Sequence, residues 1–293
     1  MKPSTADSYT HHWNSYKRFL SQHCISFSLP ADPNTVAKFI VYLSNQSLKP
    51  STIRTYLSAI SFVHKMKNLY DPVSSMLVSK TMQGLVNLSP KNTSSTLMPI
   101  TRTVLHNIIL ALMKTYLSTY HKIMYKALFL LSYYACARSG EMVVSATDEH
   151  TIKLKNVQAF NALFGKTFKI SFETYKHSNG PTDTILQPIP GNNFCPVASL
   201  STYMDIRGVK AGPLFLNSSG TPLTREEYSQ KLKLCASIAN LPVNRINTHS
   251  FRIGRATQLA SENASDATIR QVGRWKSSAF RSYIKPTHVV LPK

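Results

Sequence analysis

The sequence predicts a mainly α-helical protein with a small antiparallel sheet, an α+β fold arranged as two domains. Three patterns predict it. Apolar residues recur at helical spacing through residues 5–88. A segment rich in Ser, Thr and Pro, without periodicity, follows at residues 89–99. We therefore expect a helical domain at residues 1–88, a linker at 89–99 and a mixed second domain at 100–293, where residues 166–189 resemble two strands joined by a turn.

The first domain is expected to contain four helices. Aromatic residues at Tyr9 and Trp13 mark one face of the first. Asp32 and Ser51 stand where N-caps are expected for the second and third helices, and the fourth follows Pro72. Apolar stripes of this kind usually form the core between helices. The polar faces carry Lys and Arg with few acidic residues, so the bundle should present a basic surface.

The second domain is predicted to be mostly helical around one hairpin. Residues 166–174 alternate as a strand does, and residues 184–189 can return beside them. The segment between them contains the turn formers Asn179, Gly180 and Pro181. Helices are expected at residues 101–116, 119–137, 196–207, 224–240, 249–262, 266–272 and 277–284.

The chain is strongly basic. Its 293 residues include 34 Lys and Arg against 13 Asp and Glu, a formal net charge of +21. Such an excess repels itself unless a polyanion is present, so nucleic acid is the expected partner. The longest apolar stretch, residues 127–137, is too short to span a bilayer, which argues against a membrane partner.

The cysteine pattern argues against disulfides and metal. Cys24, Cys136, Cys195 and Cys235 lie far apart and form no CxxC pair. None of the 10 histidines stands at ligand spacing from a cysteine. We therefore expect a reduced, intracellular protein with no metal and no other cofactor.

Two short clusters suit phosphate binding. Arg138 follows an apolar helix and precedes Glu141 by three residues; alone, it reads as a helix-end cation paired with that carboxylate. In the second cluster, Thr248 can cap a helix whose first turn places His249 and Arg252 on one face. Such a helix start can hold phosphate through free N–H groups and positive charge. A lone histidine there is about as often structural as functional.

Three further residues gain meaning only from their context. Tyr283 is one of 14 tyrosines and would ordinarily be a packing residue. It lies in a late basic segment, however, eight residues after Trp275, whose indole can wall a polar site. Lys176 lies in the expected hairpin turn, where most lysines are simply solvated.

Taken together, these elements resemble the tyrosine recombinase (phage integrase) family over nearly the whole chain. That family has an N-terminal helical, SAM-like core-binding domain and a C-terminal catalytic domain. Each motif is short and occurs often by chance, so their order and context carry the resemblance. The family order of Arg-x-x-Glu, hairpin lysine, His-x-x-Arg, His or Trp, and nucleophilic tyrosine is met by Arg138 with Glu141, Lys176, His249 with Arg252, Trp275 and Tyr283.

The phrases HSFRIGRAT (residues 249–257) and GRWKSSAFRSYI (residues 273–284) are most similar to recombinases of eukaryotic mobile elements of the Crypton, DIRS and Ngaro types. This similarity implies a nuclear location. The spacing from Trp275 to Tyr283 is one residue shorter than in most bacterial and phage members. Only ten residues follow Tyr283, where many relatives have a helix that docks on a neighbouring subunit.

The resemblance implies a recombinase or integrase that cleaves and rejoins duplex DNA through a 3′-phosphotyrosine intermediate, without metal or ATP. Arg138 and Arg252 would hold the charge of the pentacoordinate phosphate, because guanidinium groups stay ionised and donate paired hydrogen bonds. A phenol holds its proton at neutral pH, so His249 would accept it as Tyr283 attacks. Lys176 would protonate the leaving 5′ oxygen.

The expected partner is double-stranded DNA, bound by both domains of a chain that associates into a dimer or tetramer on the DNA. Trp275 would donate its indole N–H to the phosphate, and Glu141 would support Arg138. For any one surface cation, solvation is about as common as a DNA contact. The candidate DNA contacts are Arg54 and Lys65 in the first domain, and Arg245, Arg255, Arg270, Arg274, Lys276 and Arg281 in the second.

Two other functions remain open at this point. A type IB topoisomerase resembles the recombinases in its catalytic residues but relaxes supercoils instead of joining new DNA partners. A domesticated protein of the same fold would bind DNA without cleaving it.

Overall fold

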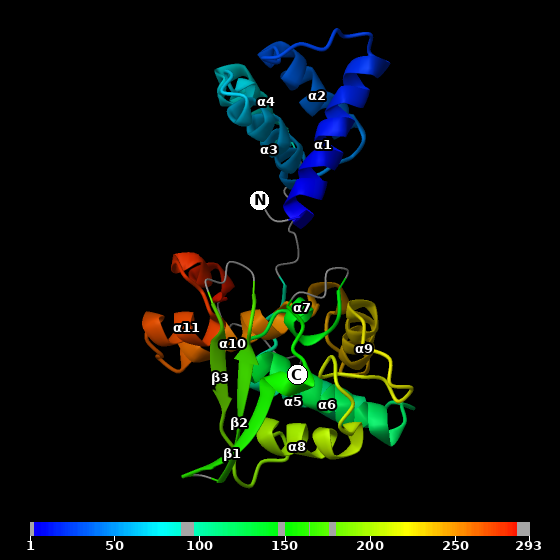
Figure 1. The fold of residues 1–293 in the computed structure, drawn as a ribbon, viewed down its shortest axis with the longest axis vertical. Helices are drawn as coiled ribbons and strands as arrows, with labels where there is room; N and C mark the ends of the chain where they lie inside the picture. The colour runs from blue at the N-terminus through cyan, green and yellow to red at the C-terminus, as the bar shows by residue number, and fades with distance from the viewer. Residues whose placement is uncertain (1–2, 89–96, 146–149, 164, 176–179, 286–293) are drawn as a thin grey trace. The chain divides into compact units, whose positions relative to one another are not determined.

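The computed structural model describes residues 3–88, 97–145, 150–163, 165–175 and 180–285. The chain divides into two compact units, Met1–Ser94 and Ser95–Lys293, which are described separately. The described part of the first unit forms four α-helices and one 3-10 turn (Figure 1). These are α1 (Pro3–Gln22), α2 (Pro33–Asn45), α3 (Pro50–Met66), η1 (Pro72–Ser74) and α4 (Met76–Leu88).

Local sequence explains where these helices begin. The Asp32 carboxylate accepts hydrogen bonds from the backbone N–H groups of Asn34 and Thr35, as an N-cap should. The predicted cap at Ser51 is wrong: α3 begins at Pro50, which follows the cap residue Lys49. Proline suits the first helical position because no N–H is needed there.

The core of the first unit consists of the apolar faces of its four helices. Tyr16, Phe39 and Ile60 are fully buried among them. His64 is buried as well, and its ring is satisfied: Nε2 accepts a hydrogen bond from the Ala31 backbone N–H at 2.9 Å, and Nδ1 donates to the Ile60 carbonyl at 2.7 Å. The histidine therefore joins the loop before α2 to α3 and is a structural residue.

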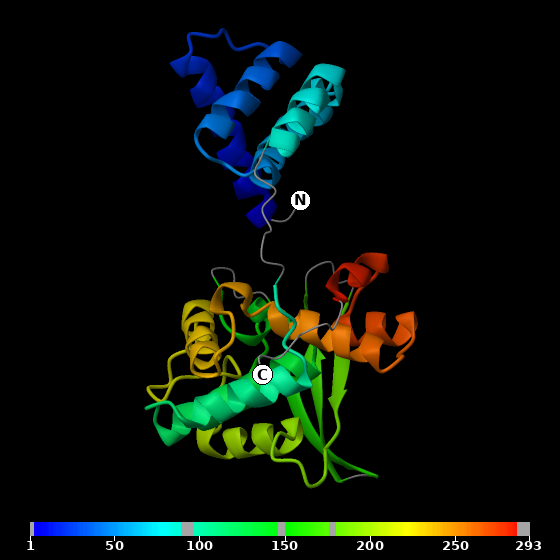
Figure 2. The ribbon, with the colours of Figure 1, turned by 180° about the vertical axis from the view of Figure 1, so that it is seen from behind.

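The second unit is built around α6, which is buried over most of its length. Figures 1 and 2 show α6 between α8 on one side and α10 on the other, with which it packs. The segment predicted as a helix at residues 277–284 is a 3-10 helix, η4. The helical elements are α5 (Arg102–Met113), α6 (Thr119–Tyr134), α7 (Ser139–Met142), η2 (Leu154–Asn156), α8 (Pro196–Arg207), α9 (Arg225–Ile238), η3 (Val243–Arg245), α10 (Ser250–Ser261), α11 (Asp266–Gly273) and η4 (Ser278–Tyr283).

The sheet has three antiparallel strands in the order β1 (Val157–Ala162), β2 (Gly165–Phe172) and β3 (Thr182–Leu186). Strands β2 and β3 correspond to the predicted hairpin, with Phe172 opposite Thr182. Strand β1 was not predicted: it is exposed after its first residue and lacks the alternating apolar pattern. The predicted fold class, mainly helical with a small antiparallel sheet, is confirmed.

Candidate active site

The C-terminal end of α6 offers two backbone carbonyls to buried guanidinium groups. The helix stops at Tyr134, and Cys136 then adopts a positive φ of 47°. Carbonyls at a helix end lack intrahelical donors and carry the negative end of the helix dipole. The Ala135 carbonyl accepts a hydrogen bond from Arg274 Nη1 at 3.0 Å, and the Cys136 carbonyl accepts one from Arg252 Nη1. One helix end thus anchors two arginines that are distant in sequence.

Arg138 follows this turn as the N-cap residue of α7. Glu141 Oε2 accepts a hydrogen bond from the Arg138 backbone N–H at 2.9 Å, and Oε1 accepts one from Arg138 Nη1 at 2.8 Å. The Arg138 side chain is 23% exposed, whereas that of Glu141 is only 2% exposed. The pairing holds the guanidinium in place while part of it faces solvent, where a ligand can meet it.

Glu141 is shared with a second guanidinium. Its Oε2 accepts a 2.6 Å hydrogen bond from Arg274 Nη2, and the Arg274 side chain is only 1% exposed. Burial by itself would raise the pKa of Glu141, but Arg274, then Arg138 and Arg252, outweigh it and hold that pKa below its ordinary value. The carboxylate is therefore ionised at neutral pH.

Arg252 is fully buried on α10. Its Nη1 and Nη2 donate hydrogen bonds to the carbonyls of Cys136 and Gly273. Its guanidinium carbon lies 4.1 Å from the centroid of the Trp275 ring and 5.6 Å from that of Tyr283. The guanidinium is thus fixed between two carbonyls and two aromatic rings, one of which belongs to the predicted nucleophile.

His249 lies beside Tyr283, with ring centroids 5.1 Å apart, and the Trp275 and Tyr283 centroids are 4.9 Å apart. His249 is the N-cap residue of α10, and its own backbone N–H donates to Asn247 Oδ1 at 2.8 Å. The helix therefore begins one residue later than a cap at Thr248 would place it. A surface hollow of about 280 Å³ is lined by Leu97, His249, Ile253, Ser282, Tyr283 and Lys285.

The imidazole of His249 is held in its neutral form, which is able to accept a proton. Partial burial lowers the pKa of His249 below its ordinary value, and the positive charges of Arg252 and Arg138 lower it further. The ring is therefore neutral at neutral pH. Cys136, another nucleophilic group nearby, is fully buried, and burial raises the pKa of its thiol despite the adjacent arginines. It stays protonated and enclosed.

The structure thus gathers most of the predicted catalytic residues from four separate segments of the second unit. The gathered residues are Arg138, Glu141, His249, Arg252, Trp275 and Tyr283. Lys176 lies outside the described residues.

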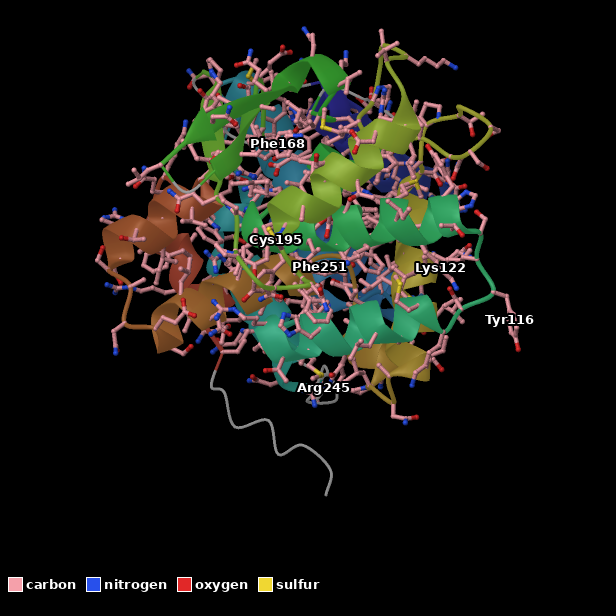
Figure 3. All side chains as sticks on the ribbon, turned by 90° about the horizontal axis from the view of Figure 1, so that it is seen from below. Tyr116, Lys122, Phe168, Cys195, Arg245 and Phe251 are labelled. Atoms are coloured by element: carbon pink, nitrogen blue, oxygen red, sulfur yellow. The ribbon has the colours of Figure 1, made fainter. Side chains whose placement is uncertain are left out.

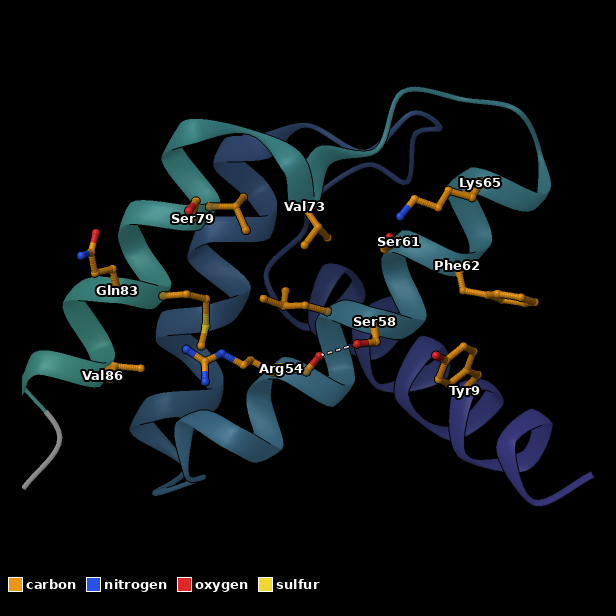
Figure 4. A pocket seen from close by; sticks show the side chains of 13 residues that line it. Tyr9, Arg54, Ser58, Ser61, Phe62, Lys65, Val73, Ser79, Gln83 and Val86 are labelled. Atoms are coloured by element: carbon orange, nitrogen blue, oxygen red, sulfur yellow. Dashed lines mark hydrogen bonds between the residues drawn. The ribbon is translucent and has the colours of Figure 1, made fainter. Parts of the chain in front are cut away.

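Two predicted DNA contacts lie together on the first unit. Arg54 and Lys65 are exposed on the same face of α3, with Ser58 and Ser61 between them, and line a groove of about 740 Å³ (Figure 4). Lys65 is 3.3 Å from a carboxylate oxygen of Asp71. The groove therefore has a basic group towards each end of its α3 wall.

Four predicted contacts of the second unit are exposed: Arg245, labelled in Figure 3, and Arg270, Lys276 and Arg281. Arg281 Nη2 pairs with Asp266 at 2.9 Å, and both side chains are open to solvent. Exposed pairs of this kind are weak and exchange readily for another anion.

The two remaining predicted contacts are placed differently. Arg255 is half-buried, with its guanidinium over the rings of Tyr133 and Tyr134. The expectation that Arg274 contacts DNA is corrected by its burial: its guanidinium is 3.7 Å from the Phe172 ring centroid and paired with Glu141. A buried carboxylate requires a counterion, and Arg274 supplies it.

Sequence reasoning missed the role of Gly273. A β-carbon at this position would lie 1.7 Å from Cζ3 of Trp275, so only glycine lets the indole pack across the backbone. A glycine two residues before a predicted site tryptophan was the available signal. The carbonyl acceptors at residues 135, 136 and 273 had no signal, because every residue carries a carbonyl.

Among the described residues, no group of three or more His, Cys, Asp and Glu side chains is placed to hold a metal ion. None of the described helices has the length and apolar character needed to cross a membrane.

No family model matches the sequence, and no curated protein matches it. Solved structures match its fold. The XerH site-specific recombinase in a post-cleavage complex with a palindromic difH substrate is 18% identical, with a TM-score of 0.66 over 94% of this chain and 74% of that one. A lambda integrase dimer bound to a COC′ core site is 12% identical, with a TM-score of 0.63 over 100% of this chain and 75% of that one.

The Tn1549 transposon integrase in complex with transposon right-end DNA is similar as well. It is 15% identical, with a TM-score of 0.62 over 97% of this chain and 88% of that one. At these identities the likeness concerns the fold. The chain therefore has the fold of the tyrosine recombinases.

Proposed function

We propose that this chain is a tyrosine recombinase that cleaves and rejoins duplex DNA. The observation that carries the proposal is the setting of Tyr283. Its ring lies 5.1 Å from that of the neutral His249 and 5.6 Å from the buried guanidinium of Arg252. Arg138, the second guanidinium, is close enough to lower the pKa of the same histidine. A phenol, a base and two fixed cations are the groups that phosphoryl transfer to a tyrosine requires.

In the proposed reaction, the Tyr283 oxygen attacks a backbone phosphorus as His249 accepts the phenolic proton. The bond from phosphorus to the 5′ oxygen breaks, and that oxygen takes a proton from Lys176, a role that rests on the sequence resemblance. Arg138 and Arg252 stabilise the negative charge that grows on the non-bridging oxygens, the role that the sequence resemblance implies. A 5′-hydroxyl then attacks the 3′-phosphotyrosine, restoring the phosphodiester and releasing the phenol.

The proposed partner is double-stranded DNA, bound mainly through phosphate contacts by two or four copies of the chain. The net charge of +21 supports this partner, as do the exposed cations of both units. The XerH and lambda integrase structures with the same fold are complexes with DNA. The phrases around Arg252 and Tyr283 support a eukaryotic mobile element as the source, with integration or excision in the nucleus.

The decisive experiment is covalent trapping. A library of nicked duplexes with randomised sequence is incubated with the protein, and DNA that remains bound after denaturation is sequenced. We expect the wild-type protein to trap a common site and Tyr283→Phe to trap none. Equal trapping by both proteins would exclude Tyr283 as the nucleophile.

Two outcomes would replace the proposal. Relaxation of a supercoiled plasmid that lacks the trapped site would indicate a topoisomerase. Sequence-selective binding without any covalent product would indicate a DNA-binding protein that has lost catalysis.

A further inference from the structure

A third arginine, Arg274, acts on the same carboxylate, Glu141, as Arg138 and Arg252. Its side chain is only 1% exposed and is held by contacts within the protein. It joins four segments of the second unit. Nη1 donates to the Ala135 carbonyl at 3.0 Å and lies 3.4 Å from the Thr184 hydroxyl on β3, and the guanidinium plane lies over Phe172 on β2. Nη2 donates to Glu141 at 2.6 Å.

This last contact determines how Glu141 holds Arg138. The carboxylate accepts from Arg138 Nη1 through one oxygen, and from Arg274 and the Arg138 backbone through the other. Because Oε2 is occupied by Arg274 and by the Arg138 backbone, the carboxylate cannot rotate to form a bidentate pair with the Arg138 guanidinium. The rest of the Arg138 guanidinium is thereby left facing the solvent side of the site.

The backbone of Arg274 serves the other cation. Arg274 ends α11 in the left-handed conformation, with φ of 54°. It stands between Gly273, whose carbonyl accepts from Arg252, and Trp275, whose ring packs on the same guanidinium. The buried side chain of Arg274 therefore anchors the three-residue segment that holds Arg252.

We propose that Arg274 is a positioning residue for the cleavage reaction: it presets both Arg138, through Glu141, and Arg252, through the segment 273–275. The inference rests on the proposed recombinase function. Lysine cannot replace it, because one ammonium group cannot span the carbonyl, the hydroxyl and the carboxylate while stacking on an aromatic ring. Since a displacement of about 1 Å in a reacting group can cost about 100-fold in rate, Arg274→Lys should be slow although it keeps the charge.

The first test compares wild type, Arg274→Lys and Arg274→Met in single-turnover cleavage of the trapped nicked site. We expect an about 100-fold lower cleavage rate for both variants, with the Kd for duplex DNA within about threefold of wild type. Lys233→Arg, an exchange of exposed cations on α9, is the matched control and should cleave at the wild-type rate. Wild-type cleavage by Arg274→Lys, or an equal loss of binding and cleavage, would overturn the positioning role.

A pH profile separates positioning from general loss of structure. The charged and titratable groups acting on Glu141 are Arg138, Arg252 and Arg274, with the Cys136 thiol beside them. Without the positive charge of Arg274, less offsets the effect of burial, and the pKa of Glu141 rises. Glu141 then becomes protonated as the pH falls, so the cleavage rate should fall steeply. In Arg274→Met with Glu141→Gln, no carboxylate remains to be protonated, and this added pH dependence should vanish. Its persistence would overturn the proposal.

A measurement that does not depend on catalysis separates the positioning role of Arg274 from the proposed recombinase function. In protein labelled with ¹³C at glutamate carboxyl carbons, Glu141 should titrate at a higher pH in Arg274→Met than in wild type, and an unchanged titration would overturn the pairing. If the titration moves but wild-type protein never cleaves DNA, the recombinase function itself is overturned. If wild type cleaves and Arg274→Lys cleaves equally, only the positioning role is overturned.

Discussion

Replacing Gly273 with alanine is the most direct test of the packing around the proposed nucleophile. A β-carbon there would lie 1.7, 2.0 and 2.4 Å from three carbons of the Trp275 ring. Carbon atoms in contact sit about 3.5–4.0 Å apart, so the indole must move by about 2 Å. It packs at 4.1 Å on the Arg252 guanidinium and at 4.9 Å on the Tyr283 ring. The displacement therefore reaches both groups.

The expected effect is on cleavage. Misplacing a reacting group by about 1 Å costs about 100-fold, which corresponds to about 2.7 kcal/mol of transition-state stabilisation. Single-turnover cleavage of the trapped site by Gly273→Ala should therefore be at least about 100-fold slower. Duplex binding, measured by gel shift, should change little, because the glycine is buried and most binding comes from phosphate contacts elsewhere.

Gly84→Ala is the matched control. Gly84 lies within α4 of the first unit, and an added β-carbon would meet nothing within 4 Å. Alanine is favoured over glycine inside a helix by about 1 kcal/mol, so the melting temperature should rise while cleavage is unchanged. Wild-type cleavage by Gly273→Ala would show that the indole can move freely. Its packing on Arg252 would then have no part in catalysis.

Four further changes have distinct expected results. Gly254→Ala places a β-carbon 1.8 Å from the Ile100 carbonyl oxygen, and this overpacking should lower stability by at least about 1–3 kcal/mol in thermal melts followed by circular dichroism. The cleavage rate should rise with pH through the pKa of His249, which lies below 6.5, and level off above it. His249→Gln should cleave about 10²–10⁴-fold more slowly. A wild-type pH profile in that variant would exclude His249 as the base. Arg138→Ala should lose about 10²–10³ in rate with duplex binding retained, whereas an equal loss of both would make it a general DNA contact. Arg54→Ala should reduce the slope of log K against log salt by about 0.9, and an unchanged slope would remove it from the interface.

Much of the fold follows from local patterns. The alternation in β2 buries Phe168, Ile170 and Phe172, so strand and turn could be predicted from residues close in sequence. Strand β1 could not, because only Val157 among its residues is buried and its place depends on pairing with β2. The prediction that Ser51 caps the third helix was wrong for a different reason. Proline is favoured at the first helical position, so the helix begins at Pro50, before the serine.

The residues predicted to carry the chemistry could be named from the sequence, whereas the residues that hold them in place could not. Arg138, His249, Arg252 and Tyr283 stand in short motifs that a sequence displays directly. The second partner of Glu141, Arg274, is 133 positions away, and nothing local distinguishes a buried counterion from a surface cation. Arg274 was therefore interpreted as a DNA contact like its basic neighbours. Such a pairing becomes visible only when the chain folds and the carboxylate is found enclosed.

The net charge of the described cluster connects the buried pair of Glu141 and Arg274 with the proposed phosphoryl transfer. Three guanidinium groups, on Arg138, Arg252 and Arg274, surround the single carboxylate of Glu141, which leaves two positive charges in a largely buried space. Such an excess is costly in a low-dielectric site without an anion. A phosphodiester brings one negative charge, and its pentacoordinate state brings about two. If the proposed reaction takes place here, the cluster would complement its transition state better than the bound substrate, which is the condition for binding energy to accelerate a reaction.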